Sequence, residues 1–163
     1  MLQIIPLERL HWPEVRKIYE EGINTGNATF QSETPAWEKW DADHLQHCRI
    51  IALLNNEVAG WAALSPVSGR CVYAGVAEVS VYVAEKFRGN KIGNSLLQQL
   101  VIESEKNNLW TLQAGIFPEN KASLTIHENN GFRLIGYREK IGEMNGVWRD
   151  TLYLERRSKI VGV

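Results

Sequence analysis

The stretch from Glu78 to Val101 constrains the fold of this chain more than any other. Its first part alternates valine with polar or aromatic residues at Val79, Val81 and Val83, which is the period of a strand with two distinct faces. From Ile92 onward, apolar residues recur every three or four positions instead, which predicts a helix with one apolar stripe. The sequence therefore predicts a strand that leads through a short turn into a helix.

The turn between this strand and this helix is basic and has few bulky side chains. It reads Arg88-Gly89-Asn90-Lys91-Ile92-Gly93 and continues into Asn94. Such a turn before a helix presents free backbone N–H groups and the positive end of the helix dipole, which together suit a phosphate or pyrophosphate. Because lysine lacks the conformational freedom of glycine, we expect a helical or extended backbone at Lys91, whose charge would help to neutralise a phosphate.

Length and composition bound the class of protein. With 163 residues, 44% of them hydrophobic and 23% charged, the chain suits a single domain, 1–163, with a sizeable core. A formal net charge of -1 argues against a nucleic-acid binder that relies on bulk electrostatics. Cys48 and Cys71 are too few for a disulfide framework or a zinc site, so we expect free thiols and no metal. The absence of a signal peptide or an apolar run of membrane-spanning length favours a cytoplasmic protein with no membrane partner.

Periodicity and turn signals predict an α/β domain around a mixed sheet. Strands are expected at 2–5, 50–54, 58–64, 78–83, 109–117, 132–141 and 147–154. Helices are expected from Pro13 to about residue 23, from Trp37 to about Gln46 after a cap within 32–34, at 92–101 and at 121–130. Gly131 is expected to end the last helix in a left-handed conformation, and Asn145-Gly146 to form a hairpin turn.

This order of elements resembles the GCN5-related N-acetyltransferase (GNAT) superfamily. The strand, basic turn and helix are followed by a further strand, Asn120-x-x-Ser123, a short helix and Gly131-Phe132, so the resemblance covers nearly the whole chain. It implies the GNAT fold, in which a central, mixed, mostly antiparallel twisted sheet of six to seven strands is flanked by about four helices. It also implies that the amides of the basic turn hold the pyrophosphate of acetyl-coenzyme A.

The resemblance also assigns roles within the turn and the central strand. Arg88 and Gly93 match the outer positions of the motif Arg/Gln-x-x-Gly-x-Gly/Ala, and Lys91 replaces its middle glycine. In the superfamily the central strand splays from its neighbour, and its free backbone pairs with the pantetheine arm. That role would fall to Val81-Tyr82-Val83, whose N–H groups would also stabilise the charge that develops on the thioester oxygen.

Closer similarities point to one branch, the phosphinothricin and methionine sulfoximine N-acetyltransferases. The similar segments are Glu78-Val79-Ser80-Val81-Tyr82-Val83, Ile126-His127-Glu128, Gly146-Val147-Trp148-Arg149-Asp150, Ala28-Thr29-Phe30, and the pair Arg70 and Tyr73. The resemblance implies transfer of an acetyl group to the α-amine of a small amino acid whose side chain carries a phosphinate, sulfoximine or sulfone. It also implies a homodimer.

Glu78 is the expected general base. An ammonium group cannot attack a thioester, so the amine must first lose a proton, which a carboxylate beside the acetyl group can accept. His127 stands where this branch usually carries a histidine, and it would serve as a general acid for the leaving thiolate or as a proton relay to Glu78. The alternatives are structural: an ion-paired glutamate at the edge of a strand, and a histidine of the core.

The remaining candidates bind the two ligands. Asn120 and Ser123 would bond the pantetheine amides or the phosphate-side oxygens, although Asn120 is equally well placed to cap the short helix. Arg70 would hold the carboxylate or phosphinate of the acceptor through its forked donors, or else be a solvated loop residue. The acceptor side is completed by Thr29, Phe30 and Tyr73, with Phe30 as an apolar wall.

Two rival functions stay open. In the first, the acceptor is a polyamine, an aminoglycoside or a protein N-terminus, which the near-neutral charge and Arg70 disfavour. In the second, the chain is a catalytically inactive acetyl-CoA-binding sensor, which Lys91 favours and the pair Glu78 and His127 disfavours. Because neither cysteine lies within the motifs, we expect direct attack in a ternary complex with acetyl-CoA and a small-molecule amine, without an acetyl-cysteine intermediate.

Overall fold

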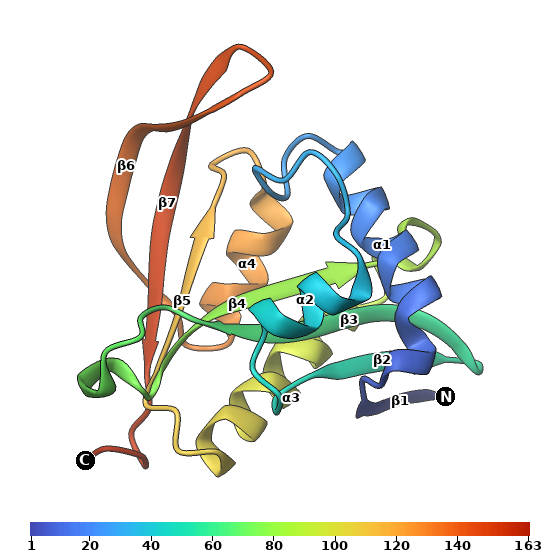
Figure 1. Cartoon of the computed structure of the whole chain (residues 1–163), viewed down its shortest axis with the longest axis horizontal. Coiled ribbons are helices and arrows are strands. Elements are labelled where there is room, and N and C mark those ends of the chain that lie inside the picture. The colour runs from blue at the N-terminus through green and yellow to red at the C-terminus, as the bar shows by residue number, and fades with distance from the viewer.

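A computed structural model describes all residues of the chain, 1–163, and its strands form one mixed sheet (Figure 1). The order across the sheet is β1-β2-β3-β4-β5-β7-β6, and every neighbouring pair is antiparallel except β4 with β5. The strands are β1 Leu2–Pro6, β2 Ile50–Leu54, β3 Glu57–Pro66, β4 Val76–Val83, β5 Thr111–Ile116, β6 Arg133–Met144 and β7 Val147–Arg157. The helices are α1 Trp12–Asn24, α2 Trp37–Asp43, α3 Ile92–Lys106 and α4 Lys121–Asn129. The expected α/β class and element order are confirmed.

Helices cover the two faces of the sheet unequally. On one face, the apolar stripe of α3 packs into a core of 18 buried residues, against which α4 also packs. On the other face, α1 and α2 form a second core of nine buried residues around Val15, Trp40 and Trp61. None of the buried residues of this second core comes from β5, β6 or β7. The half of the sheet formed by β5, β7 and β6 therefore has no helix on the side of α1, and the β6–β7 hairpin extends beyond the rest of the molecule (Figure 1).

The central strand β4 separates from β5 partway along its length. β4 pairs with β3 from Ala77 to Val83, but its parallel pairing with β5 stops at Glu78. Beyond Glu78, the backbone edge of β4 that faces β5 has no strand partner, which is the splay that the resemblance implies. This opening leaves N–H and C=O groups free for a ligand.

The second helix is shorter than expected, and its expected side-chain cap is wrong. α2 has seven residues, begins after the extended residue Ala36 and has no side-chain cap. It stops before His44, which is extended with φ -111° and ψ 152°. The buried guanidinium of Arg49 explains the stop, because it donates to the backbone oxygens of Asp41 at 2.8 Å and of His44 at 3.1 Å. These acceptors at the helix C-terminus are thereby satisfied without another turn.

The backbone at Lys91 also differs from the prediction. Lys91 is left-handed, with φ 60° and ψ 14°, so the expected helical or extended conformation is wrong. This residue is the N-cap of α3, and its carbonyl accepts hydrogen bonds from both the backbone N–H and the hydroxyl of Ser95. The start of α3 thus fixes the sharp turn, at a cost of about 1–2 kcal/mol for a side chain in this region.

Two turns that the sequence predicts are confirmed. Gly131, directly after α4, has φ 84°, and its N–H donates to the carbonyl of Glu128. Asn145 and Gly146, between β6 and β7, have φ values of 52° and 77°, which suit a tight hairpin turn with two left-handed residues. No helix of the structure has the length and apolar character to cross a membrane.

Candidate active site

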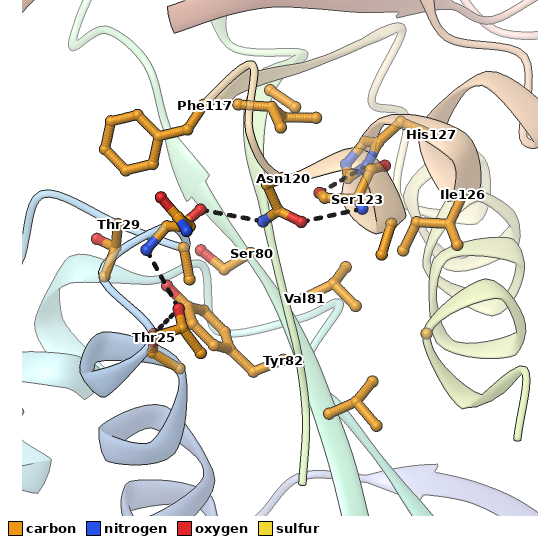
Figure 2. Close-up of a pocket in the computed structure, with 18 of the residues that line it drawn as sticks. Thr25, Thr29, Ser80, Val81, Tyr82, Phe117, Asn120, Ser123, Ile126 and His127 are labelled. Carbon is orange, nitrogen blue, oxygen red and sulfur yellow. Dashed lines mark hydrogen bonds between the residues drawn. The ribbon is translucent and has the colours of Figure 1, made fainter. Parts of the chain in front are cut away.

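A cavity of about 1140 Å³ opens where β4 leaves β5 (Figure 2). Its walls come from β4, the N-terminus of α3, α4, the end of β5 and the loop between α1 and α2. Segments far apart in the sequence thus share one space. Its size is ample for an extended ligand together with a second, small one.

The basic turn forms one end of this cavity. Arg88, Gly89, Lys91, Gly93 and Asn94 line it, as does Ile92. The N–H groups in the first turn of a helix have no partner within the helix, so this end presents donors together with a positive dipole. The guanidinium of Arg88 forms none of the ion pairs of the structure and stays available for an anion.

Asn90 has a different place from the rest of the predicted turn. It does not line the cavity, and its side-chain amide donates to the carbonyl of Phe87 at 3.0 Å. Gly93, in contrast, lies where α3 approaches its neighbours: a Cβ there would be 3.3 Å from Ile126 and 3.4 Å from Val83. Asn90 therefore braces the turn, while Gly93 allows α3 to pack closely against α4 and β4.

Asn120 and Ser123 line the cavity at the start of α4 (Figure 2). The Asn120 Oδ1 atom accepts a hydrogen bond from the backbone N–H of Ser123 at 3.2 Å, so the predicted capping role is confirmed. Its Nδ2 atom donates to the carbonyl of Asn27, also at 3.2 Å. Both polar groups of Asn120 are thus engaged within the protein, while the Ser123 hydroxyl has only a long contact of 3.4 Å, with the Nδ1 atom of His127.

Glu78 lies at the point where β4 and β5 separate, and it lines the cavity. Glu78 is an exposed residue, and its partial desolvation within the cavity raises the pKa of its carboxyl above the ordinary glutamate value, while Gln113 and the charge of Arg138 oppose part of this rise. Glu78 takes part in none of the ion pairs of the structure, so the alternative of a paired structural glutamate is not observed. A carboxylate in this setting has a stronger affinity for a proton than one in water.

His127 lies on α4, and its ring packs edge-on against Phe132 at 4.9 Å between centroids. The Nδ1 atom is 2.7 Å from the carbonyl oxygen of Ser123, so it carries a proton and donates it there. The Nε2 atom is buried and has no hydrogen-bond partner. Burial lowers the pKa of His127, which keeps the ring neutral. This geometry favours a structural histidine, and a catalytic role stays a prediction.

The loop between α1 and α2 closes the acceptor side of the cavity. Thr29 and Phe30 both line it, as expected. The Phe30 ring lies 4.8 Å from that of Phe117, and a Cβ at Gly142 of β6 would come within 2.9 Å of it. Phe30 thus fits between the end of β5 and the β6 strand as an apolar wall.

Arg149 of β7, which the sequence analysis noted only within a similar segment, holds this loop in place. Its guanidinium donates to the carbonyl of Gly26 at 2.9 Å and to the Oδ1 atom of Asn27 at 2.8 Å, and it pairs with Glu119 at 3.3 Å. It also lies 4.2 Å from the centre of the Phe117 ring. Residues more than a hundred positions apart meet here, so no local pattern signals this contact.

Arg70 and Tyr73 do not lie with the other predicted acceptor residues. They belong to the loop before β4, where the Arg70 guanidinium is 5.6 Å from the centre of the Tyr73 ring, and neither lines the main cavity. Tyr73 instead lines a smaller cavity of about 600 Å³ together with Gln113 and Glu155. Within one chain, the structure brings Glu78, Thr29 and Phe30 to a common space and leaves Arg70 outside it. No group of three or more His, Cys, Asp or Glu side chains is arranged to hold a metal ion.

The fold and the cavity at the splayed strand define an acetyltransferase of the GNAT type, and the chain belongs to the acetyltransferase (GNAT) family, whose model matches residues 10–132. Over 155 residues it is 30% identical to an L-methionine sulfoximine/L-methionine sulfone acetyltransferase of Pseudomonas paraeruginosa (strain DSM 24068 / PA7), a match that covers 88% of this chain and 87% of the relative. It is 37% identical over 102 residues to YwnH of Bacillus subtilis (strain 168), named as a candidate phosphinothricin acetyltransferase. That match spans only 63% of each chain.

Solved structures share the fold over nearly the whole chain. A crystal structure named as a candidate phosphinothricin N-acetyltransferase has a TM-score of 0.86 and 31% identity, and the match covers 96% of this chain and 98% of that one. A phosphinothricin acetyltransferase from Sinorhizobium meliloti, solved in complex with AcCoA, has a TM-score of 0.88 at 24% identity, covering 99% of this chain and 90% of that one. At that identity the second likeness concerns the fold alone.

Proposed function

We propose that the protein is an acetyl-CoA-dependent N-acetyltransferase that modifies the α-amine of a small amino acid, such as phosphinothricin, methionine sulfoximine or methionine sulfone. One observation carries the proposal: a single cavity joins the amides and free arginine of the basic turn to an unpaired carboxylate with a raised pKa, Glu78. The names of the relatives support the acceptor class.

The residues present fit the coenzyme. The first-turn amides of α3 and Arg88 suit a pyrophosphate, and the unpaired backbone edge of β4 suits the amides of a pantetheine arm. Acetyl-CoA would supply the acetyl group as a thioester. The N–H groups of Val81 or Val83 would donate to its carbonyl oxygen as that oxygen gains charge.

Glu78 would make the acceptor amine nucleophilic. In the ternary complex, its carboxylate accepts a proton from the ammonium group, directly or through one water. The freed lone pair would then form the new C–N bond as the C–S bond breaks, and the second proton of the nitrogen would pass to the departing sulfur, directly or through a relay, to give the amide and the free thiol of coenzyme A. Because partial desolvation in the cavity raises its pKa, Glu78 holds the proton more firmly than a glutamate in bulk water would.

In a neutral ring protonated at Nδ1, the Nε2 atom of His127 is an acceptor, so we propose that it relays a proton and acts as a general acid only after Nε2 has gained one. Two substitutions separate this role from packing, because Gln can place a polar atom near the position of Nε2 and Asn near that of Nδ1. If Nε2 takes part in the chemistry, His127→Gln should retain more kcat than His127→Asn at equal melting temperature. The reverse order, or equal kcat values with both variants less stable, would establish a structural role through the bond to Ser123.

An assay of thiol release tests the proposal as a whole. Acetyl-CoA would be offered with methionine sulfone, methionine sulfoximine, phosphinothricin, spermidine, an aminoglycoside and a peptide panel. The proposal expects turnover with the amino acids. Turnover only with spermidine, the aminoglycoside or the peptides would identify the rival acceptor classes, and coenzyme binding without turnover would identify the inactive sensor.

We also propose that the protein is cytoplasmic and that it is a homodimer, as the resemblance implies for the dimer. Large apolar side chains that are each more than half exposed support self-association through the hairpin: Leu134, Tyr137, Ile141, Val147 and Trp148. Light scattering on the purified chain should give twice the 18.5 kDa of one copy. A mass of one copy at micromolar concentration would contradict the dimer.

A further inference from the structure

Four side chains form a polar row across the half of the sheet that lacks a helix on the side of α1. The polar row consists of Glu78 on β4, Gln113 on β5, Tyr153 on β7 and Arg138 on β6. The register places Glu78 opposite Gln113 and places Arg138 opposite Thr151, two residues before Tyr153. Opposite residues of a ladder share a face, as do residues two apart on one strand, so the row begins at the proposed base and ends at a cation.

The cation at the end of the row is unpaired. The guanidinium of Arg138 lies 4.1 Å from the centre of the Tyr153 ring, and Arg138 takes part in none of the ion pairs of the structure. Its neighbour on the same strand, Arg133, is in contrast paired with Glu155 at 3.2 Å. A guanidinium that stacks on an aromatic ring keeps its N–H donors at its edge, where a carboxylate or phosphinate can accept two of them.

Arg138 does not itself line the main cavity, but its charge reaches Glu78, which does. The charge of Arg138 opposes the rise that desolvation causes in the pKa of Glu78, and it does the same for Tyr153. The two ends of the row therefore carry opposite charges within electrostatic reach of each other. Between them lie an amide and a phenol, which are neutral and able to hydrogen-bond.

Space for a ligand exists beside Tyr153. This residue is flanked by Gly115 on β5 and Gly136 on β6, which stand opposite it in the two ladders. A Cβ at either glycine would meet no atom within 4 Å. Gly115 also lines the main cavity, so the recess over the row is continuous with the space beside Glu78.

From this arrangement we infer that Arg138 binds the anionic group of the acceptor while the amine lies against Glu78, which makes Arg138 a specificity-determining residue. The inference rests on the proposed function. An α-amino acid carries a cation and an anion on one carbon, so it complements a site with a carboxylate and a guanidinium. A polyamine lacks the anion and would meet repulsion from Arg138. Neither Arg138 nor Arg70 lines the main cavity, but within one chain only the charge of Arg138 acts on Glu78.

The test compares three arginine variants on two acceptors that differ in one charge. Arg138→Gln, Arg133→Gln and Arg70→Gln would each be assayed with methionine sulfone and with its carboxamide. Arg138→Gln should raise KM for the acid about tenfold or more and leave KM for the carboxamide within about twofold, since charge-assisted hydrogen bonds are lost only with the acid. The other two variants should change neither value. Equal effects on both acceptors, or a selective effect of Arg70→Gln alone, would overturn the inference.

Two measurements keep the inference separate from folding and from the proposed reaction. Coenzyme A affinity by calorimetry and the melting temperature should be the same for Arg138→Gln and the unmodified chain. Direct binding of methionine sulfone in the presence of coenzyme A, followed by NMR, needs no turnover. If the chain acetylates no amine, the proposed function fails, yet loss of this binding in Arg138→Gln would still uphold the anion site, and unchanged binding would refute it.

Discussion

The two ends of the active cavity are built in different ways. The end that we propose for the coenzyme consists of backbone amides at a strand, a turn and a helix that follow one another in the sequence, and α3 anchors it in the larger core. The end that we propose for the acceptor is lined by β4, the end of β5, Thr151 of β7 and the α1–α2 loop, next to the half of the sheet that has no helix on the side of α1. A ligand common to the family can be held by backbone geometry, whereas a variable ligand is selected by replaceable side chains.

Glu78 joins the two ends, so its loss should have the largest effect. Glu78→Gln should lower kcat/KM at neutral pH by about 100-fold or more, because general base catalysis is lost. The kcat/KM of the variant should rise partly toward that of the unmodified chain at high pH, where the free amine of the acceptor is abundant. In the unmodified chain, activity should fall as pH drops through the raised pKa of Glu78, and so at higher pH than for an ordinary glutamate. Profiles of kcat/KM against pH check both points, and a profile unchanged by the substitution would remove Glu78 as base.

At the coenzyme end, Arg88→Ala should weaken coenzyme A binding by about tenfold or more, because a charge-assisted contact to phosphate is lost. The KM of the acceptor should change little. Lys86→Ala is the matched control, since Lys86 lies two residues away and is exposed, yet pairs with Glu57. Calorimetry with coenzyme A measures both variants. Equal affinities would show that Arg88 does not contact the phosphates.

At the acceptor end, Arg149→Lys should raise the acceptor KM about fivefold, because lysine keeps the charge but cannot donate to Gly26 and Asn27 together. Coenzyme A affinity should stay the same. Arg156→Lys is a matched control on the same strand, where a similarly covered guanidinium pairs with Glu105 far from the loop. Steady-state kinetics measure the effect on each ligand separately. If Arg149→Lys weakened coenzyme A binding as much as it raised the acceptor KM, the two ends of the cavity would not be independent.

The smallest expected effect concerns the strained residue of the turn. Lys91→Gly and Lys91→Ala both remove the charge, but only glycine is free of the cost of φ 60°. The glycine variant should therefore melt about 2–4 °C above the alanine variant, the shift expected for about 1 kcal/mol in a domain of this size. Thermal unfolding measures the difference. Identical melting temperatures would show that the left-handed turn carries no strain.

This contrast also explains what the sequence could predict. The alternation of Val79, Val81 and Val83, the cap at Asn120 and the turn at Gly131 are local patterns, and the structure confirms each element that they predict. The conformation of Lys91 was missed because residue type alone does not show which neighbours fix a turn.

The residues that we propose for the acceptor end are harder to predict because register and loop contacts place them. Arg138 reaches the polar row only through the pairing of β6 with β7, which shifts between Arg138 and Gly142. Arg149 meets the α1–α2 loop across more than a hundred residues. Arg70 was chosen by resemblance, and nothing in its own segment indicated how far it lies from Thr29 and Phe30.

The exposed hairpin has a consequence for how this protein can change. Nine of the twelve β6 residues are exposed, whereas α3 contributes six buried residues to the interior. Most variants with a random substitution in β6 should thus still fold. Most variants with a substitution among the buried residues of α3 should fail to fold. In a mutant library or over evolutionary time, we therefore expect new acceptor preferences to arise through substitutions in the hairpin, while coenzyme binding at α3 is retained.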